Sequence, residues 1–373
     1  MLSFLFGLFV AATLVQLVFW WIVFARLARF DPEKRPGTVI VSAFPPVSVV
    51  ICARNEAANL RQNLPGILQQ QYPAFEVLVV DDDSTDETPA VLNGLREQYP
   101  HLRVLRVSPK TTPGKKHALG LGIAAAQTGY LVFTDADCAP AGPDWLRHMT
   151  LPLLTEATAE IVLGYAPHRR APGWLNRWVR FETVQTALQY FGFALAGRPY
   201  MGVGRNLAWR RDIFRRVGGY EPHAALASGD DDLLVNAAAH AGNTAICLKP
   251  GAFVYSNGAA SWRAWLRQKR RHLSAGRHYR PEHQFYLAVL AGAHVLHYFL
   301  LTTLLLTDFG TISVAFYALR MASAFPIYWK ILRRFREKRL LLWFPLLDAL
   351  LAIYYAVFVP RALILSNYLI SWK

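Results

Sequence analysis

Val-Leu-Val-Val-Asp-Asp-Asp (residues 77–83) and Tyr-Leu-Val-Phe-Thr-Asp-Ala-Asp (residues 130–137) are the two stretches that decide the fold. In each, a short apolar run typical of a buried strand leads directly, or after one threonine, into aspartates. Carboxylates at the carboxyl ends of buried strands lie where open α/β sheets bind their ligands. A single aspartate cluster is more often a solvated turn or a helix cap, so the interpretation depends on the surrounding sequence.

The chain from residue 46 to residue 256 alternates between strand and helix patterns. This alternation predicts an α/β fold with a mostly parallel sheet covered by helices. A segment of about 200 residues is long enough for one domain with its own core. The predicted strands are residues 47–52, 77–80, 104–107 and 130–133, and the predicted helices are residues 56–70, 89–98 and 118–126.

The composition is too apolar for an ordinary soluble enzyme, with 53% hydrophobic and 17% charged residues and a mean hydropathy of +0.20. Residues 2–25 carry no charge and are long enough to cross a bilayer as a helix. Because no basic residue precedes Arg26, this segment predicts a retained anchor rather than a signal peptide.

Three further candidate spans lie near residues 285–306, 309–331 and 340–365. The middle one contains Arg320, and an arginine at membrane depth normally faces protein or water rather than lipid. A pair of interfacial helices is the alternative interpretation.

Basic residues gather beside the predicted spans, in residues 26–35, 263–280 and 330–339. If there are four spans, these three stretches share one side, which the positive-inside rule identifies as the cytoplasm. The net charge of +15 is then mostly a signature of membrane flanks, and no nucleic-acid partner is expected. We therefore expect a multi-pass protein of the cell (inner) membrane that contacts membrane lipid and has its central domain in the cytoplasm.

The expected organisation has four parts: an N-terminal transmembrane anchor (residues 1–27), the α/β domain (46–260), an interfacial amphipathic helix (261–280) and a C-terminal transmembrane region (283–371). The interfacial helix is predicted because Trp262 and Trp265 lie three residues apart among many basic residues. The three cysteines are widely spaced and are expected to be buried small hydrophobes.

Asp135 and Asp137 are separated by one residue, so in an extended segment their side chains point to the same side. Two such carboxylates suit Mg²⁺ or Mn²⁺, with other coordination positions left for phosphate oxygens and water. A divalent ion there would stabilise the charge that develops on a diphosphate leaving group. Asp81 and Asp82, at the end of another strand, are placed to accept hydrogen bonds from a base N–H or ribose hydroxyls.

Two further charged clusters are open to more than one interpretation. Lys115 and Lys116 do not belong to a P-loop, because Pro109 stands where that motif needs glycine. They are interpreted either as a donor contact or as a solvated pair. Residues 230–232, three aspartates before a predicted helix, either complement the helix dipole or include a general base for a hydroxyl nucleophile.

The order of these clusters resembles the family 2 glycosyltransferases, the membrane GT-A group that includes ceramide glucosyltransferase and the cellulose, chitin and hyaluronan synthases. The resemblance covers roughly residues 47–276. The matching motifs are a strand with an Asn-Glu turn (49–56), Val-Asp-Asp-x-Ser-x-Asp (80–86), Gly-Lys-x-x-Ala-Leu (114–119), DxD (135–137), Gly-x-Gly-x-Asn with paired arginines (202–211), an acidic pair (230–231) and Gln-x-x-Arg (268–271).

The resemblance implies a GT-A fold, a UDP-sugar donor, a divalent metal, inversion at the anomeric carbon and a cytosolic active site. It makes Asp231 the catalytic base and Asp135 and Asp137 the metal ligands. The donor-binding residues would be Arg54, Glu56, Asp81, Asp82, Lys115, Asp135 and Arg271, and the acceptor-binding residues Gly204, Asp230, Gln268 and His272.

One departure from the family pattern bears on the product. His272 stands where the family usually has the tryptophan that, in processive synthases, contacts the acceptor sugar. We therefore expect one sugar to be transferred to a lipid or lipid-linked acceptor. The alternatives are a processive polysaccharide synthase, for which four spans are few, a nucleotidyltransferase, for which no Gly-rich phosphate loop is evident, and a non-catalytic membrane protein. The sequence does not identify the sugar.

Overall fold

The computed structural model describes residues 1–33, 43–110, 114–226 and 228–364. The chain divides into two compact units. Among the described residues, the α/β unit contains Asp31–Ala171 and Pro199–Ala260, and the helical unit contains Met1–Phe30, Pro172–Arg198 and residues 261–364. Lys34 and Arg35 of the first basic flank and residues 365–371 of the predicted transmembrane region lie outside the described residues.

The α/β unit is built on a seven-stranded sheet with the strand order β3-β2-β1-β4-β7-β6-β8. The first four strands in this order are parallel, and β7 is antiparallel to both of its neighbours. The strands are β1 (Val47–Ala53), β2 (Phe75–Asp82), β3 (Leu102–Val107), β4 (Tyr130–Phe133), β6 (Ile161–Gly164), β7 (Leu207–Arg210) and β8 (Thr244–Cys247). The expected α/β class with a mostly parallel sheet is confirmed.

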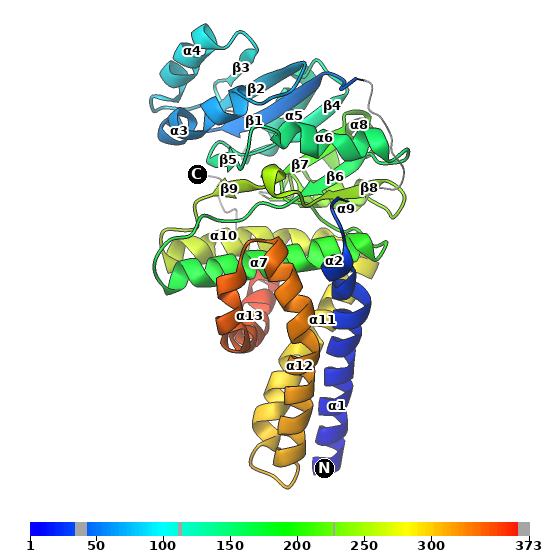
Figure 1. Ribbon diagram of the computed structural model, residues 1–373. Coiled ribbons are helices and arrows are strands. Elements are labelled where there is room, and N and C mark those ends of the chain that lie inside the picture. The colour runs from blue at the N-terminus through cyan, green and yellow to red at the C-terminus, as the bar shows by residue number, and fades with distance from the viewer. Residues whose placement is uncertain (34–42, 111–113, 227, 365–373) are drawn as a thin grey trace. The chain divides into compact units, whose positions relative to one another are not determined.

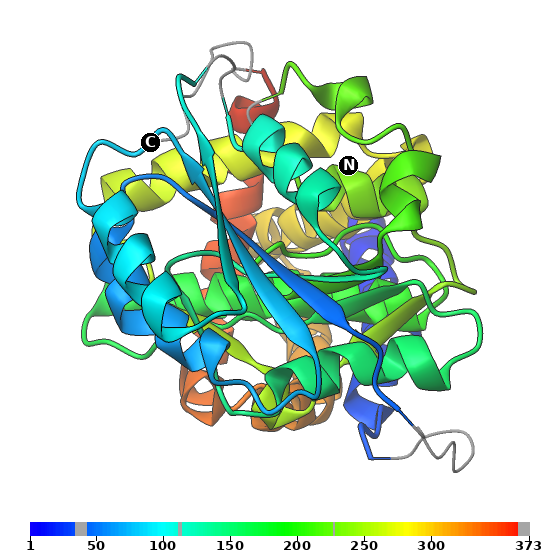
Figure 2. The ribbon, with the colours of Figure 1, turned by 90° about the horizontal axis from the view of Figure 1, so that it is seen from above.

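Helices cover both faces of this sheet. Figure 2 shows α5 (Lys116–Ala125) on one side of β1 and β2, and α6 (Trp145–Thr155) on the other. The sheet face that α6 covers is also covered by α3 (Ala57–Leu68). The side chains of Leu60, Leu64 and Ile67 on α3 belong to the main hydrophobic core. On the α5 side, a Cβ added at Gly122 would lie 2.7 Å from a methyl of Val80, so this helix packs unusually close to the sheet.

The remaining elements of the α/β unit are short. β5 (Cys138–Pro140) and β9 (Val254–Ser256) form a separate antiparallel pair that begins next to the DxD motif. The helices are α4 (Thr88–Gln98), α8 (Asp212–Arg216) and α9 (Asp232–Ala238). All predicted strands and helices of residues 47–133 are present, although β2 extends two residues beyond each predicted end and includes Asp81 and Asp82.

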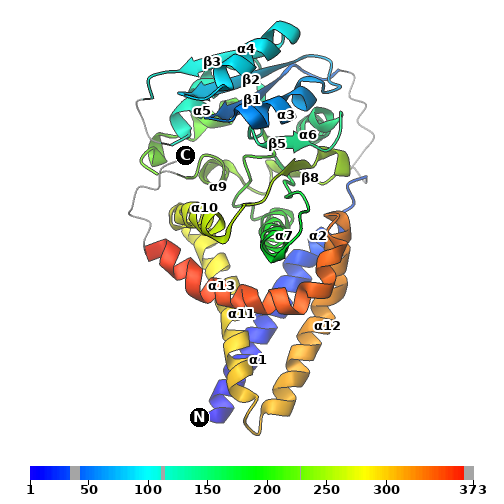
Figure 3. The same ribbon diagram turned by 90° about the vertical axis from the view of Figure 1, so that its left-hand side faces the viewer.

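The helical unit contains four helices that are long and apolar enough to cross a membrane. The first of them, residues 2–29, consists of α1 (Leu2–Val18), a π-helical segment (Phe19–Phe24) and α2 (Ala25–Arg29). Figures 1 and 3 show α1 running beside α11 (Pro281–Leu304) and α12 (Gly310–Arg334), whereas α13 (Phe344–Ile364) crosses α11. The predicted set of one N-terminal and three C-terminal candidate spans is confirmed.

A buried polar network joins these four helices. Arg320 on α12 is 1% exposed, and its Nη1 lies 2.6 Å from Oδ2 of Asp348 on α13. Its Nε donates to Oε1 of Gln16 on α1 at 2.8 Å. From α11, the hydroxyl of Tyr298 donates to Asp348 at 2.6 Å, and His294 Nε2 lies 2.9 Å from the Asp348 carbonyl oxygen. The expectation that Arg320 faces protein is confirmed.

The predicted amphipathic segment forms α10 (Trp262–Ala275), which lies beside α7 (Trp174–Leu195). Trp265 is buried, with its ring 6.0 Å from that of Trp178, while Trp262 is exposed. Lys269 forms an ion pair with the buried Glu182 of α7 at 2.5 Å. One face of α10 therefore packs on protein, and its contact with a bilayer stays a prediction. All three cysteines are buried, as expected.

Candidate active site

Most of the predicted donor-site residues lie at the edge of the sheet where the parallel strands end. β1 pairs in parallel with both β2 and β4, so the carboxyl ends of these three strands adjoin. Arg54 and Glu56 follow β1, Asp81 and Asp82 end β2, and the DxD motif follows β4. This edge is where an open α/β sheet binds its ligand.

The loops after β1 and β2 are tied together by polar side chains. Asn55 donates its backbone N–H to Ser84 Oγ at 3.0 Å, and Asp86 accepts from the backbone N–H groups of Ala57 and Thr88 at 3.3 and 2.9 Å. Asp81 Oδ1 accepts from the Ser84 N–H at 3.1 Å. Asp81 therefore fixes its own loop, in addition to any role toward the donor.

Asp82 is buried and forms an ion pair with Lys110, which also donates to the carbonyl oxygen of Gly114 at 2.7 Å. Lys110 was not predicted as a site residue, because nothing in its local sequence distinguishes it from a surface lysine. It links the end of β2 to the glycine that precedes Lys115. Glu56 accepts a hydrogen bond from Asn59 in the first turn of α3.

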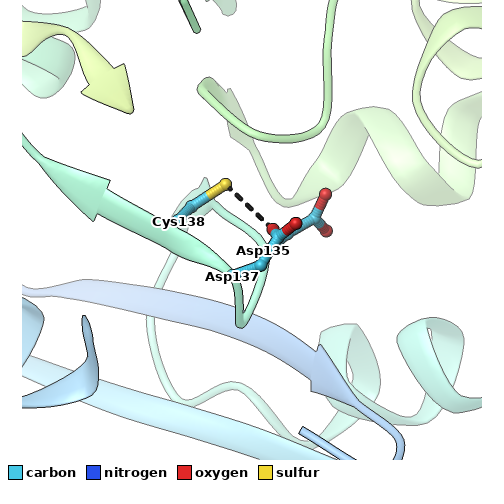
Figure 4. Close-up of side chains that lie close together, drawn as sticks. All are labelled: Asp135, Asp137 and Cys138. Carbon is cyan, nitrogen blue, oxygen red and sulfur yellow. Dashed lines mark hydrogen bonds between the residues drawn. The ribbon is translucent and has the colours of Figure 1, made fainter. Parts of the chain in front are cut away.

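Asp135, Asp137 and Cys138 place their ligand atoms within 4.8 Å of one another, and Figure 4 shows the three side chains gathered at the start of β5. The Cys138 thiol donates to Asp137 Oδ1 at 3.3 Å. Burial, and then the charge of Asp135, raise the pKa of Asp137. A cation between the two carboxylates would relieve this repulsion. A hard ion such as Mg²⁺ or Mn²⁺ would favour the carboxylates over the soft sulfur, so the residues fit the predicted metal.

Lys115 connects the DxD motif to the acidic cluster before α9. Its Nζ lies 2.5 Å from Asp135 Oδ1 and 3.5 Å from Asp230 Oδ2. Burial by itself would lower the pKa of Lys115, but the two carboxylates raise it well above its ordinary value, so the amine stays charged. Lys116 is also buried and donates to the His223 carbonyl oxygen at 2.6 Å. The interpretation of these lysines as a solvated pair is wrong.

Asp231 is the N-cap of α9, where its Oδ1 accepts from the Asp232 N–H at 2.8 Å. Its Oδ2 accepts from the backbone N–H of Gly204. A Cβ added at Gly204 would lie 3.2 Å from that oxygen, so glycine allows the loop to approach the carboxylate. Burial, and then the charge of Asp230, raise the pKa of Asp231 to about 6. The capping interpretation is confirmed, and a base with this pKa also suits proton transfer near neutral pH.

The rest of the Gly-x-Gly-x-Asn motif has two different environments. Asn206 is fully buried, accepts from Trp145 Nε1 at 2.9 Å and donates to two backbone carbonyl oxygens, so it holds the loop in place. Arg205 donates to Ser256 Oγ at 2.6 Å, and its charge opposes the rise in the pKa of Asp137. Arg205 is a site residue that the sequence interpretation missed, because it occupies the variable position of the motif.

Three predicted residues belong to the other unit. Gln268 and Arg271 are partly exposed and His272 is exposed, all on α10 of the helical unit. Their roles toward donor and acceptor stay predictions.

Comparisons with known proteins point to the same family. Residues 48–218 match the family described as Glycosyl transferase family 2, and residues 135–371 match Glycosyl transferase family group 2. The probable glycosyltransferase YdaM of Bacillus subtilis is 29% identical over 237 residues, which cover 61% of this chain and 54% of that protein. The beta-monoglucosyldiacylglycerol synthase of Synechocystis is 31% identical over 172 residues, which cover 44% of this chain and 35% of that protein. The chain therefore spans about half, or less, of the length of these relatives.

A solved structure shares the fold. The mannosyltransferase PcManGT from Pyrobaculum calidifontis, in complex with GDP-Man and Mn²⁺, aligns with a TM-score of 0.62 over 96% of this chain and 99% of that chain. The two sequences are 21% identical, so the likeness concerns the fold.

Proposed function

The chain belongs to glycosyltransferase family 2, and from that premise we propose that it transfers one sugar from a UDP-sugar to a hydroxyl of a lipid or lipid-linked acceptor. The observation that carries the proposal is the position of Lys115, which contacts both Asp135 of the DxD motif and Asp230 beside the predicted base. A group that could hold the donor diphosphate and a group that could deprotonate the acceptor thus belong to one connected charge cluster.

In the proposed reaction, Asp231 accepts the proton of the acceptor hydroxyl while the oxygen forms a bond to the anomeric carbon. The bond from that carbon to the diphosphate breaks on the opposite side, which inverts the configuration. Asp135 and Asp137 would hold a divalent cation, which supplies charge stabilisation to the leaving diphosphate when it is bound. The charged Lys115 provides a further positive group beside Asp135. Asp81, Asp82, Arg54 and Glu56 are proposed to bind the rest of the donor.

A lipid acceptor is supported by three kinds of observation. The chain carries four helices able to cross a membrane, and three relatives that match it have names of glycolipid synthases. Trp262 on α10 is exposed, and aromatic residues among basic ones suit the bilayer interface. His272 has a smaller ring than the tryptophan that holds a growing sugar chain in processive synthases, which favours single transfer over polymer synthesis.

The deciding experiment supplies the purified full-length protein with a panel of radiolabelled nucleotide sugars, vesicles that contain diacylglycerol or other hydroxyl-bearing lipids, and Mn²⁺ or Mg²⁺. We expect one nucleotide sugar to give release of nucleoside diphosphate and, by mass spectrometry, a lipid that carries one added sugar. A ladder of many additions, or a polymer that a polysaccharide hydrolase digests, would identify a processive synthase instead.

The variant Asp137→Asn tests the metal site, because it keeps the size of the side chain but removes a charged ligand. Calorimetric titration should show that the folded variant loses Mn²⁺-dependent UDP binding. Asp212→Asn, which changes an exposed aspartate on α8, is the matched control and should bind as the wild type does. Metal-dependent binding that survives in Asp137→Asn would contradict the metal role.

We also propose that the α/β unit lies in the cytoplasm, because the basic stretches flank the predicted spans on one side. The buried native cysteines give little labelling background, so single cysteines can be introduced at exposed Asp308, between α11 and α12, and at exposed Lys338, after α12. A membrane-impermeant maleimide should label Asp308→Cys in intact cells and Lys338→Cys only after permeabilisation. Both termini would then lie outside the cytoplasm, provided that α13 also crosses the bilayer. The reverse pattern would place the α/β unit outside.

A further inference from the structure

A small cavity lies inside the α/β unit, between α5, the ends of β1 and β4, and the segment that leads into α9. Its polar end is formed by Lys115, Asp230 and Asp231. Thr134, which directly follows β4, and Trp209 on β7 line it together with apolar side chains. The cavity thus contacts the predicted base from inside the fold.

Two residues of this lining carry a buried polar atom without a partner. Thr134 Oγ1 and Trp209 Nε1 have no hydrogen bond to any residue that the structure describes, although the two side chains are only 2% and 1% exposed. An indole N–H can only donate, so Trp209 needs an acceptor. Leaving a buried donor unsatisfied is unfavourable, because the N–H loses its hydrogen bond to water and gains none in the protein. The ring of Trp209 packs edge-on against Phe133 with centroids 4.8 Å apart, which fixes the direction of the indole.

We propose that this cavity binds one ordered water molecule, which accepts a hydrogen bond from Trp209 Nε1, bonds to the Thr134 hydroxyl and donates to the carboxylates of Asp230 and Asp231. Buried waters typically make about three hydrogen bonds to otherwise unsatisfied groups, and cavities that stay dry are apolar. The residues that line this cavity carry an indole N–H, a hydroxyl and two carboxylates, so their chemistry suits a wet site rather than a dry one.

The carboxylate of Asp231 has a free lone-pair site that can accept a hydrogen bond from this water. Each carboxylate oxygen accepts one backbone N–H, from Asp232 and from Gly204. A carboxylate offers about four lone-pair sites, so two stay available, one for the water and one for the acceptor hydroxyl. By accepting this hydrogen bond, the carboxylate would be held in an orientation in which its remaining lone pair points toward the acceptor hydroxyl. Thr134 and Trp209 are therefore positioning residues, and this effect on rate rests on the proposed role of Asp231.

The direct test is a crystal or cryo-electron microscopy structure of the full-length protein at a resolution that shows ordered water. We expect density for one water within hydrogen-bond distance of Thr134 Oγ1 and Trp209 Nε1. An empty cavity, or density that contacts neither atom, would overturn the proposal. This outcome does not depend on what reaction the protein catalyses, so it separates failure of the water site from failure of the proposed function.

The functional test uses Thr134→Val, which keeps the shape of the side chain and removes the hydroxyl. The loss of one hydrogen bond corresponds to a fall of about 2–10-fold in kcat, and KM for the donor should hold. Thr134→Ser, which restores the hydroxyl, should recover most of the rate. Thr150→Val is the matched control, because that buried hydroxyl bonds to the Leu146 carbonyl oxygen of its own helix α6. A wild-type kcat in Thr134→Val, or an equal loss in Thr134→Ser, would contradict the positioning role.

Discussion

Replacing Asp231 with asparagine should lower kcat by a factor of about 10²–10⁴, the contribution expected of a positioned general base. Affinity for UDP should stay near that of the wild type, because the proposed diphosphate ligands belong to the DxD motif. Asparagine is as good an N-cap as aspartate, so α9 should still form. The amide has one oxygen, however, and either Asp232 or Gly204 then loses the acceptor of its backbone N–H. A modest loss of stability should accompany the loss of rate.

Asp232→Asn is the matched control, since it also removes one acidic charge from the first turn of α9 and its carboxylate accepts the Leu233 N–H at 2.8 Å. Its kcat should fall far less than that of Asp231→Asn. The wild-type kcat/KM should also fall as the pH is lowered through about 6, because the pKa of Asp231 is raised to about 6 and only the deprotonated carboxylate can accept a proton. If kcat holds in Asp231→Asn while thermal stability drops, the aspartate serves only as a cap.

The first half of the α/β unit could be predicted from sequence for a simple physical reason. Central parallel strands are buried on both faces, so β1, β2 and β4 are nearly continuous apolar runs that stand out from the helical patterns between them. β7 has no such signature. It is four residues long, ends in Arg210, and is a strand because β4 and β6 pair with it on either side. Pairing of this kind depends on partners distant in the chain, which local periodicity does not report.

The residues of the candidate active site also divide into those that could be identified from the sequence and those that could not. The aspartates could be identified because each follows a recognisable strand or precedes a recognisable helix. The state of Lys115 could not, because a lysine pair before a helix has the same local sequence whether it is solvated or buried. The amine of Lys115 is buried against Asp135 and Asp230, which come from two other parts of the chain and balance its charge. Arg205 and Trp209 were missed for the same reason, since the groups around them meet only in the folded sheet.

The helical unit offers one case in which the sequence indicated an interaction without identifying the partner. Arg320 lies inside an apolar helix and therefore had to face protein or water. The partner is Asp348, a single acidic residue near the start of α13, with Gln16 on α1 as a second acceptor. Both side chains of the pair are buried, so water cannot stabilise either charge once its partner is removed.

Replacing Arg320 alone with methionine should therefore destabilise the helical unit by about 3–5 kcal/mol, the cost of an uncompensated buried charge. The double variant Arg320→Met/Asp348→Leu removes both charges and should recover most of that loss. The exposed pair Arg198–Glu282 in the same unit is the control, and Glu282→Gln should cost about 0–1 kcal/mol. Free energies of unfolding in mixed detergent micelles would measure all three.

A single interhelical hydrogen bond averages about 0.6 kcal/mol in membrane proteins. A loss of that size in Arg320→Met, or a double variant as unstable as the single one, would show that the pair does not hold α13 to the other helices.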